Sequence, residues 1–434
     1  MARLVGYNGK RNLENLRKIK EISMREPSNM IVIPKNKEDI YDPQVFLNNL
    51  KRSDIVKFVD ANLNDNQTIS LSVEVEGEPY KLVIKPTVLE IPDFIRRMHY
   101  FSKDEAKKIE KADEGLSVCM DFEGDNAKCF FDQIRILDAM FPEILAVMDC
   151  PAEKLLSGRW VSLAAKSKIP PAPRYLFTVQ AVGNDDGQVW LHTHGLKRCG
   201  MFELEILCSD EEIYNTHYSV IESFAYRMLE SEEGINPGDA VFVGRGGGQY
   251  IVCTAVDWKE AIKFYPEATV GNEDDREDGW HGEDTCVLMM YTCPDDEANN
   301  EYTKIQEYRE LLEDNPVFML SNAETARMKS LAIERVPFLK KGLSKRGSKA
   351  LVKIGVTVDE EHWNDGEPSK EHMWFELKEI KNDSLVAELT NEPYYVSNLK
   401  KGDVGTYSFD EITDWILFTK EYRIIPDDAY LLDI

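Results

Sequence analysis

The sequence lacks any apolar run long enough to span a bilayer, which takes about 20 largely apolar residues as a helix. None of its eight cysteines forms a Cys-x-x-Cys pair. Several of them lie in apolar runs, which is typical of buried thiols in a reducing compartment rather than of a disulfide framework. The first residues contain no apolar core of signal-peptide length. We therefore expect a cytoplasmic protein that contacts no membrane.

Familiar catalytic signatures are also missing. There is no Gly-x-Ser-x-Gly elbow and no His-Glu-x-x-His pattern, so the standard hydrolase motifs are absent. The glycine-rich residues 244–248 (GRGGG) precede a strand pattern, which favours a hairpin tip over a phosphate cradle at a helix start. The acidic residues 273–284 lack the Asp-x-Asp-x-Asp-Gly order of a calcium loop, and we interpret them as a solvated surface loop.

Basic residues are scarce relative to acidic ones. The chain has 52 Lys and Arg against 78 Asp and Glu, a formal net charge of −26. Such a charge repels polyanions, so we expect no binding to nucleic acid or to an anionic membrane. The same charge attracts a basic protein partner, although solubility alone is the simpler explanation for an acidic chain.

The chain of 434 residues is too long for one ordinary core, and 43% of it is hydrophobic. Strand and helix patterns alternate in its main part, whereas its end holds short strands separated by Gly, Asn and Asp turns. These patterns predict an α+β fold, with a sheet-and-helix main region followed by a small β-rich, barrel-like C-terminal module. A short amphipathic helix is expected over residues 13–22. The predicted regions are residues 1–114 (N-terminal α+β region), 115–300 (α+β domain), 301–345 (helical connection) and 346–434 (β-rich module).

Residues 188–206 (QVWLHTHGLKRCGMFELEI) carry the most chemically informative pattern. Polar and apolar residues alternate with a period of two on both sides of a short basic loop, which predicts a β-hairpin. Antiparallel pairing with His192 opposite Glu205 also brings His194 opposite Glu203. Two of the chain's seven histidines and two glutamates then share one patch of a sheet, called here the His/Glu patch.

The His/Glu patch has two interpretations. Imidazole and carboxylate groups are suitable zinc ligands, and His217 and Cys199 are candidates for further ligands. Alternatively, the four residues form a cross-strand ladder of hydrogen bonds without a metal. His217 lies on the apolar stripe of a predicted helix, which favours a core position. The sequence leaves both interpretations open and does not identify a metal.

Three tryptophans in the C-terminal module, Trp363, Trp374 and Trp415, also have two interpretations. They either fill the core or line an exposed groove for a partner. The core is favoured because a small barrel needs large side chains to fill it.

Several longer motifs resemble known families. The C-terminal motifs are EHMWFELKEI (371–380), LTNEP (389–393), LKKGD (399–403) and ITDW (412–415). In this order they resemble the bacterial domain of unknown function 2314. The earlier motifs are YLFTVQAVG (175–183), WLHTHGL (190–196) and FELEIL (202–207). They resemble domain of unknown function 4026, which often occurs in one chain with the first. The resemblance implies a bacterial cytoplasmic protein. It implies no established activity or catalytic residue, and its association with toxin and immunity genes favours a binding role.

Two functions follow from these observations. The first is a non-enzymatic binding protein, of the immunity type, that captures a basic protein partner and uses no cofactor. The alternative is a metal-dependent enzyme in which His192 and His194 bind the metal, and Glu203 or Glu205 acts as a ligand or general base. Substrate and oligomeric state do not follow from the sequence.

Overall fold

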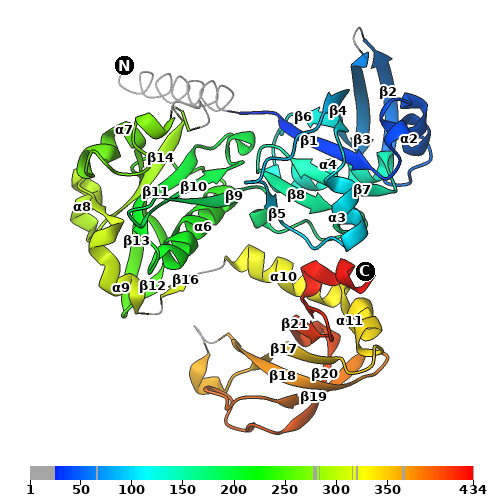
Figure 1. Cartoon of the computed structure of the whole chain (residues 1–434). Coiled ribbons are helices and arrows are strands. Elements are labelled where there is room, and N and C mark those ends of the chain that lie inside the picture. The colour runs from blue at the N-terminus through cyan, green and yellow to red at the C-terminus, as the bar shows by residue number, and fades with distance from the viewer. Residues whose placement is uncertain are drawn as a thin grey trace, which may run out of the picture. The chain divides into compact units, whose positions relative to one another are not determined.

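The computed structural model describes residues 25–64, 67–276, 281–282, 284–314, 316–318, 321–363 and 367–433. The helix expected over residues 13–22 lies outside these ranges. The chain divides into two compact units (Figure 1). Unit 1 comprises residues 1–99, 104–158 and 173–319, and unit 2 comprises residues 100–103, 159–172 and 320–434. Within the described ranges, no helix is both long and apolar enough to cross a bilayer.

The first sheet of unit 1, called sheet A, has eight strands in the order β2-β3-β4-β6-β1-β7-β8-β5. Its central strands are almost wholly buried because helix α4 (Asn126–Met140) packs on it. Asp125 begins that helix by accepting a hydrogen bond from the Lys128 amide. Sheet A contains strands from both sides of residue 114, since β4 pairs with β6. The four regions predicted from the sequence stay predictions. Its strands are β1 (Ser28–Pro34), β2 (Val56–Leu63), β3 (Ile69–Val75), β4 (Glu78–Val88), β5 (Arg96–Arg97), β6 (Glu114–Met120), β7 (Ile144–Asp149) and β8 (Lys154–Ser157).

The second sheet of unit 1, sheet B, has the order β16-β12-β13-β14-β11-β10-β9, with β15 paired to β14. The predicted hairpins over residues 188–206 and around residues 244–248 are both confirmed. Strands β11 and β14 pair in parallel although most of their neighbours are antiparallel. The strands are β9 (Thr178–Gly183), β10 (Gln188–His194), β11 (Glu203–Asp210), β12 (Val241–Gly246), β13 (Gln249–Asp257), β14 (Thr285–Met290), β15 (Thr303–Lys304) and β16 (Val317–Phe318).

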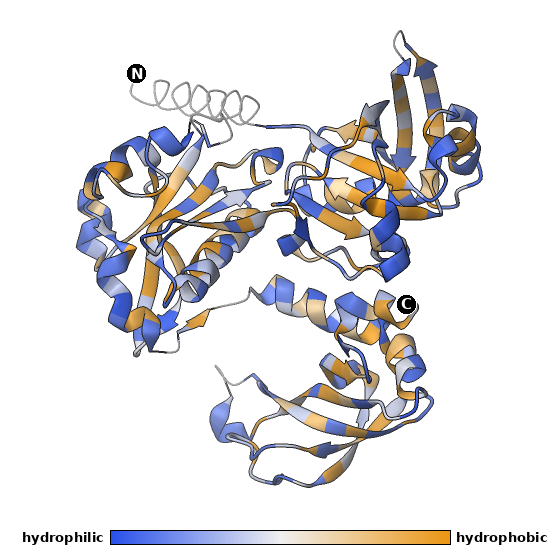
Figure 2. Ribbon diagram, in the orientation of Figure 1, coloured by the Kyte–Doolittle hydropathy of each residue, from blue (hydrophilic) through white to orange (hydrophobic). Residues whose placement is uncertain are grey.

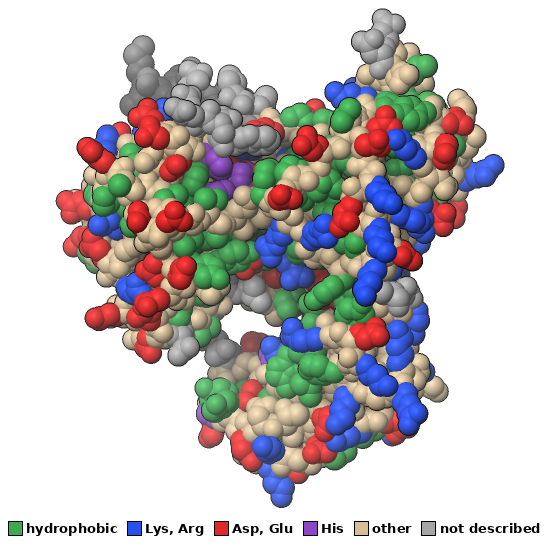
Figure 3. Space-filling model, viewed as in Figure 1, with side chains coloured by type: hydrophobic (Ala, Val, Ile, Leu, Met, Phe, Trp, Pro, Cys, Tyr) green, Lys and Arg blue, Asp and Glu red, His purple; other side chains and the backbone are tan. Residues whose placement is uncertain are grey.

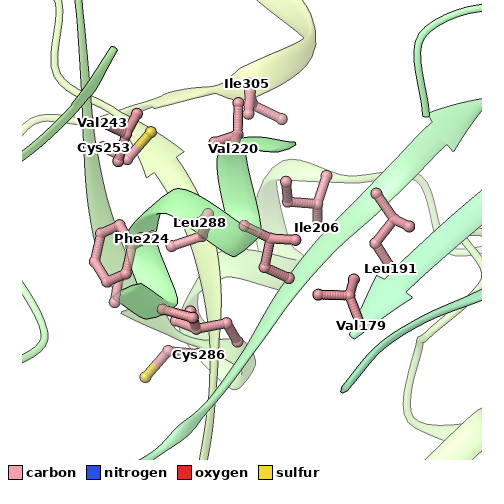
Figure 4. Close-up of a cluster of buried hydrophobic side chains, with 14 of the residues drawn as sticks. Val179, Leu191, Ile206, Val220, Phe224, Val243, Cys253, Cys286, Leu288 and Ile305 are labelled. Atoms are coloured by element: carbon pink, nitrogen blue, oxygen red, sulfur yellow. The ribbon is translucent and has the colours of Figure 1, made fainter. Parts of the chain in front are cut away.

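The two faces of sheet B bury different clusters. Helix α6 (Tyr214–Glu230) covers one face, where Val220 and Phe224 share a buried cluster with Ile206 and Leu288 (Figure 4). Helix α7 (Trp258–Ala261) lies on the other face, where Trp190 and Trp258 belong to one buried cluster. Hydrophobic residues follow the strands and the inner sides of the helices in Figure 2. The alternation along β10 therefore sends Leu191 toward α6 and Trp190 toward α7.

A buried ion pair links the two sheets of unit 1. The Arg198 guanidinium, in the turn between β10 and β11, donates to both carboxylate oxygens of Asp149 on β7, at 2.6 and 2.9 Å. It also donates to the Tyr175 and Leu176 carbonyls. Neither Arg198 nor Asp149 has any exposed surface. The pair therefore fixes the turn of the β10–β11 hairpin against sheet A.

Unit 2 contains a third sheet, in the order β20-β19-β18-β17-β21-β22. Helix α10 (Asn322–Glu334) packs on β21, where Trp415 is fully buried and donates from Nε1 to the Ala332 carbonyl. Together with sheets A and B, this β-rich module confirms the predicted α+β class. Its strands are β17 (Lys349–Thr357), β18 (Lys370–Ile380), β19 (Ser384–Leu389), β20 (Val404–Ser408), β21 (Ile412–Phe418) and β22 (Arg423–Ile424). The other helices are α2 (Pro43–Leu50), α3 (Lys103–Ile109), α5 (Gly158–Ala165), α8 (Pro294–Asn299), α9 (Arg309–Glu313) and α11 (Val336–Leu343).

Candidate metal centre

Strand β10 places two histidines side by side on the α7 face of sheet B. The ring centroids of His192 and His194 are 4.9 Å apart, as expected for positions i and i+2 of a strand. His192 lies opposite Glu205, which is the predicted register. The exposed fractions of the two histidines are 2% and 9%. Figure 3 shows histidine side chains gathered at one place on the visible face of unit 1.

A third histidine, His281, joins them from the loop between the short 3-10 helix Asp274–Arg276 and β14. Its ring centroid lies 4.4 Å from that of His192 and 5.2 Å from that of His194. One ligand atom of each histidine lies within 4.8 Å of the other two. The prediction of a solvated loop is wrong at Arg276 and His281, since each is only 8% exposed. The signal in the sequence was a histidine within an otherwise acidic segment that leads into an apolar strand.

Glu205 is engaged by Arg276 rather than by the histidines. Arg276 donates to the two carboxylate oxygens at 2.8 and 2.5 Å. The same guanidinium donates to the His281 carbonyl at 3.2 Å and to the Gly271 carbonyl at 2.8 and 3.0 Å. It also lies over the Trp258 ring, 4.1 Å from the centroid. Glu205 thus holds the arginine that binds the backbone at His281.

Glu203 shapes the hairpin turn. Its carboxylate accepts hydrogen bonds from the Thr193 hydroxyl at 2.7 Å, the Gly195 amide at 2.9 Å and the Lys197 amide at 3.1 Å. Burial raises the pKa of Glu203, although these three donors act in the opposite direction. The structure therefore brings His192 and His194 together, whereas it turns Glu203 and Glu205 toward other partners.

The electrostatic environment keeps His192 neutral. Burial lowers the pKa of His192 to about 2, and the neighbouring His194, His281 and Arg276 act in the same direction. Among the residues that the structure describes, the buried Nδ1 atom of His192 has no hydrogen-bond partner. A neutral imidazole with an unbonded nitrogen is the form that coordinates a metal ion.

The other residues singled out by the sequence lie elsewhere. His217 is fully buried and its Nδ1 atom is 2.7 Å from the Ser209 hydroxyl, consistent with a core position. Cys199 lines a separate cavity, and burial raises the pKa of its thiol to about 12. Trp363 and Trp374 are half-buried. Trp363 donates from Nε1 to the Val358 carbonyl, while Lys353 lies over the Trp374 ring.

Three family models match the chain. Residues 28–171 match the protein of unknown function (DUF4026) N-terminal model, and residues 179–289 match its C-terminal model. Residues 339–424 match the uncharacterized protein conserved in bacteria (DUF2314). No curated protein and no solved structure matches the chain. The three histidines fall within the second of these matched segments.

Proposed function

The chain belongs to the DUF4026 proteins that also carry DUF2314, and we propose that its DUF4026 part binds a divalent transition-metal ion, zinc in the first instance. The ligands are His192, His194 and His281. The observation that carries the proposal is the convergence of three imidazoles from two separate segments, with ligand atoms within 4.8 Å of one another. Imidazole nitrogen is the commonest protein ligand for zinc, together with cysteine sulfur.

Packing alone accounts poorly for this cluster. A buried polar nitrogen without a hydrogen bond costs about 1–3 kcal/mol, and Nδ1 of His192 is such an atom within the described part of the chain. Coordination would satisfy that nitrogen. Arg276 fixes the His281 backbone, so the third histidine is held in place before any ion arrives. A centre that is preorganised in this way loses little conformational entropy on binding.

Metal analysis of protein purified without chelators tests the proposal. We expect close to one zinc per chain after exposure to zinc and removal of excess, and little in His192→Ala, His194→Asn or His281→Asn. His372→Ala, which removes an exposed histidine from unit 2, is the matched control and keeps its metal. Circular dichroism of each variant separates loss of ligands from loss of fold. A wild-type protein that retains no transition metal, or a control that loses it equally, would sink the proposal.

The number of protein ligands favours an enzyme over a structural ion. Structural zinc usually has four protein ligands, whereas three protein ligands leave a position for water or substrate. Among the residues that the structure describes, the cluster supplies three, which supports the metal-dependent enzyme. Cobalt substitution tests this extension, because azide added to the Co²⁺ protein occupies an open position and changes the visible absorption. An unchanged spectrum would assign the ion a structural role.

A second candidate function, capture of a basic protein partner, is favoured by one surface of unit 2. The tyrosine patch consists of Glu360, Glu361, His362, Tyr394 and Tyr395. Tyr394 is 84% exposed and Tyr395 51%, while the carboxylate of Glu371 accepts from both of their amides at 2.9 Å. The His362 ring lies 4.8 Å from that of Tyr395. Preorganised, exposed tyrosines beside carboxylates suit lysine and arginine side chains.

A lysine-rich peptide labelled with a fluorophore is the probe for this second function. We expect Tyr394→Ala with Tyr395→Ala to weaken its binding several-fold at low salt, since each cation–π contact contributes about 0.5–1 kcal/mol. Phe94→Ala removes an exposed aromatic residue from unit 1 and serves as the control. Equal affinity for the double variant and the wild type would assign the peptide's binding to net charge alone and reject the patch.

A further inference from the structure

A glutamate in a turn of sheet A lies against one histidine of the cluster, His194. Glu153 lies in the turn between β7 and β8, and its Oε2 atom is 3.7 Å from Nε2 of His194. Both side chains are buried, at 9% and 11% exposure respectively. The group of mutually close ligand atoms contains the three histidines without Glu153. Its carboxylate therefore approaches the centre from behind His194 rather than as a fourth ligand.

The position of Glu153 is fixed by both its backbone and its side chain. Its amide donates to the Cys150 carbonyl at 3.2 Å, and its carbonyl accepts from the Arg96 amide at 3.0 Å. Gln180, which lies opposite His192 on the neighbouring strand β9, donates to the same Oε2 atom. Groups from β5, from β9 and from the residue that follows β7 thus hold Glu153 in place, with its carboxylate facing His194.

The backbone of Glu153 is also strained. Its φ of +50° lies in the left-handed region, which is unfavourable for a residue other than glycine. Such strain persists where the surrounding structure enforces it, and it clusters at functional sites. A glycine would adopt this conformation freely. The strain at Glu153 therefore accompanies a side chain whose carboxylate faces the cluster.

We infer that Glu153 is a positioning residue of the metal centre and acts on His194, a conclusion that rests on the proposed function. Histidines that bind metals generally donate their second ring N–H to a carboxylate or carbonyl, which fixes the tautomer and the ring orientation. The Glu153 carboxylate faces Nε2 of His194 at 3.7 Å, which is longer than a hydrogen bond but close enough to favour a proton on Nε2. Nδ1 of His194 is then the atom that binds the ion. The metal centre then depends on both matched DUF4026 segments, because Glu153 belongs to the first and the histidines to the second.

Two substitutions separate positioning from structural support. Glu153→Gln keeps the shape of the side chain and removes its charge. Glu153→Gly removes the carboxylate and relieves the left-handed strain, so a purely structural role predicts an unchanged or higher melting temperature. We expect both variants to stay folded and to bind zinc 10–100-fold more weakly than the wild type, the range found for partners of this kind. Competition with a chromophoric chelator measures the affinities.

The tautomer of His194 is the readout that a merely structural role would not move. Long-range ¹H–¹⁵N correlation spectra of the metal-free full-length protein show which ring nitrogen carries the proton. We expect Nε2–H in the wild type and loss of that preference in Glu153→Gly. Wild-type protein that binds zinc, with variants of equal affinity and unchanged tautomer, would overturn this inference while leaving the proposed function intact. Wild-type protein that binds no zinc would instead overturn the proposed function, and the role of Glu153 with it.

Discussion

Arg276 and Glu205 form a two-point ion pair in the interior of unit 1, with N···O distances of 2.8 and 2.5 Å. The arginine ends the short 3-10 helix Asp274–Arg276, and the glutamate is the third residue of β11. Because Arg276 also donates to the His281 carbonyl, the pair ties the third histidine to the strand beside β10. The sequence suggests the Glu205 carboxylate as a metal ligand or general base. In the structure this carboxylate instead binds Arg276, which contacts the backbone of His281.

Breaking this pair should affect stability and metal binding together. Arg276→Gln leaves Glu205 buried without its cation, and loss of one partner of a buried pair costs about 3–5 kcal/mol. We expect a lower unfolding free energy in urea and zinc affinity at least 10-fold weaker, since the His281 backbone loses its donor. In the double variant Arg276→Met, Glu205→Leu, stability should recover and zinc affinity should stay low. Full recovery of both would show that Arg276 does not position His281.

The sequence predicts the part of the site that lies within one hairpin, β10 and β11. Alternation over seven residues of β10 is enough to put His192 and His194 on one face, and the short turn is enough to place Glu205 opposite His192. The direction of a side chain in a strand depends only on its immediate neighbours. Both hairpins and the α+β class follow from the same local patterns.

The rest depends on contacts between distant segments. His281 reaches the cluster because β14 pairs in parallel with β11, and no feature of either strand specifies that pairing. Glu153 comes from a turn between two strands of the other sheet of unit 1, β7 and β8. The partner of Glu205 is Arg276, 71 positions away. Arg276 pairs with Glu205 in preference to the two nearby histidines because its guanidinium binds both carboxylate oxygens and lies over two tryptophan rings. The alternation of polar and apolar residues within one strand does not specify any of these long-range contacts.

Arg198 and Asp149 provide a second test, independent of any metal. Arg198→Met keeps much of the side-chain volume but leaves the fully buried Asp149 without its cation. We expect a loss of about 3–5 kcal/mol in the unfolding free energy, measured by urea denaturation. Lys263→Met breaks a pair that is exposed on both sides and is the control, expected to change little. A small effect in Arg198→Met would mean that the two sheets of unit 1 hold together without this pair.

The pH dependence of stability should include a contribution from His217. Burial lowers its pKa to about 4, whereas the unfolded chain has a histidine pKa near 6.5. The unfolded state therefore binds a proton first as the pH falls, so this contribution to stability is complete above about pH 6.5 and is lost toward pH 4. Between pH 7 and pH 5 it amounts to about 2 kcal/mol.

The variant His217→Gln isolates that contribution from the carboxylates that titrate nearby. The difference in unfolding free energy between pH 7 and pH 5 should be smaller in the variant by about the same amount. Urea denaturation at the two pH values gives the difference directly. An identical pH dependence in both proteins would place the pKa of folded His217 near its ordinary value.

Gly271 offers the most direct test of how the loop reaches the histidines. A Cβ atom there would lie 2.8 Å from Leu207 and 3.0 Å from the Trp190 ring, and the φ of +89° is unfavourable for any other residue. Gly271→Ala should therefore push away the segment whose carbonyl accepts from Arg276, and so lower both stability and zinc affinity. Gly248→Ala, at a φ of +80° with open space around it, carries the same backbone penalty without the clash. Because the two glycines differ only in their surroundings, a loss of zinc affinity confined to Gly271→Ala would come from displacement of the loop. Equal affinities would show that the histidine cluster tolerates such a displacement.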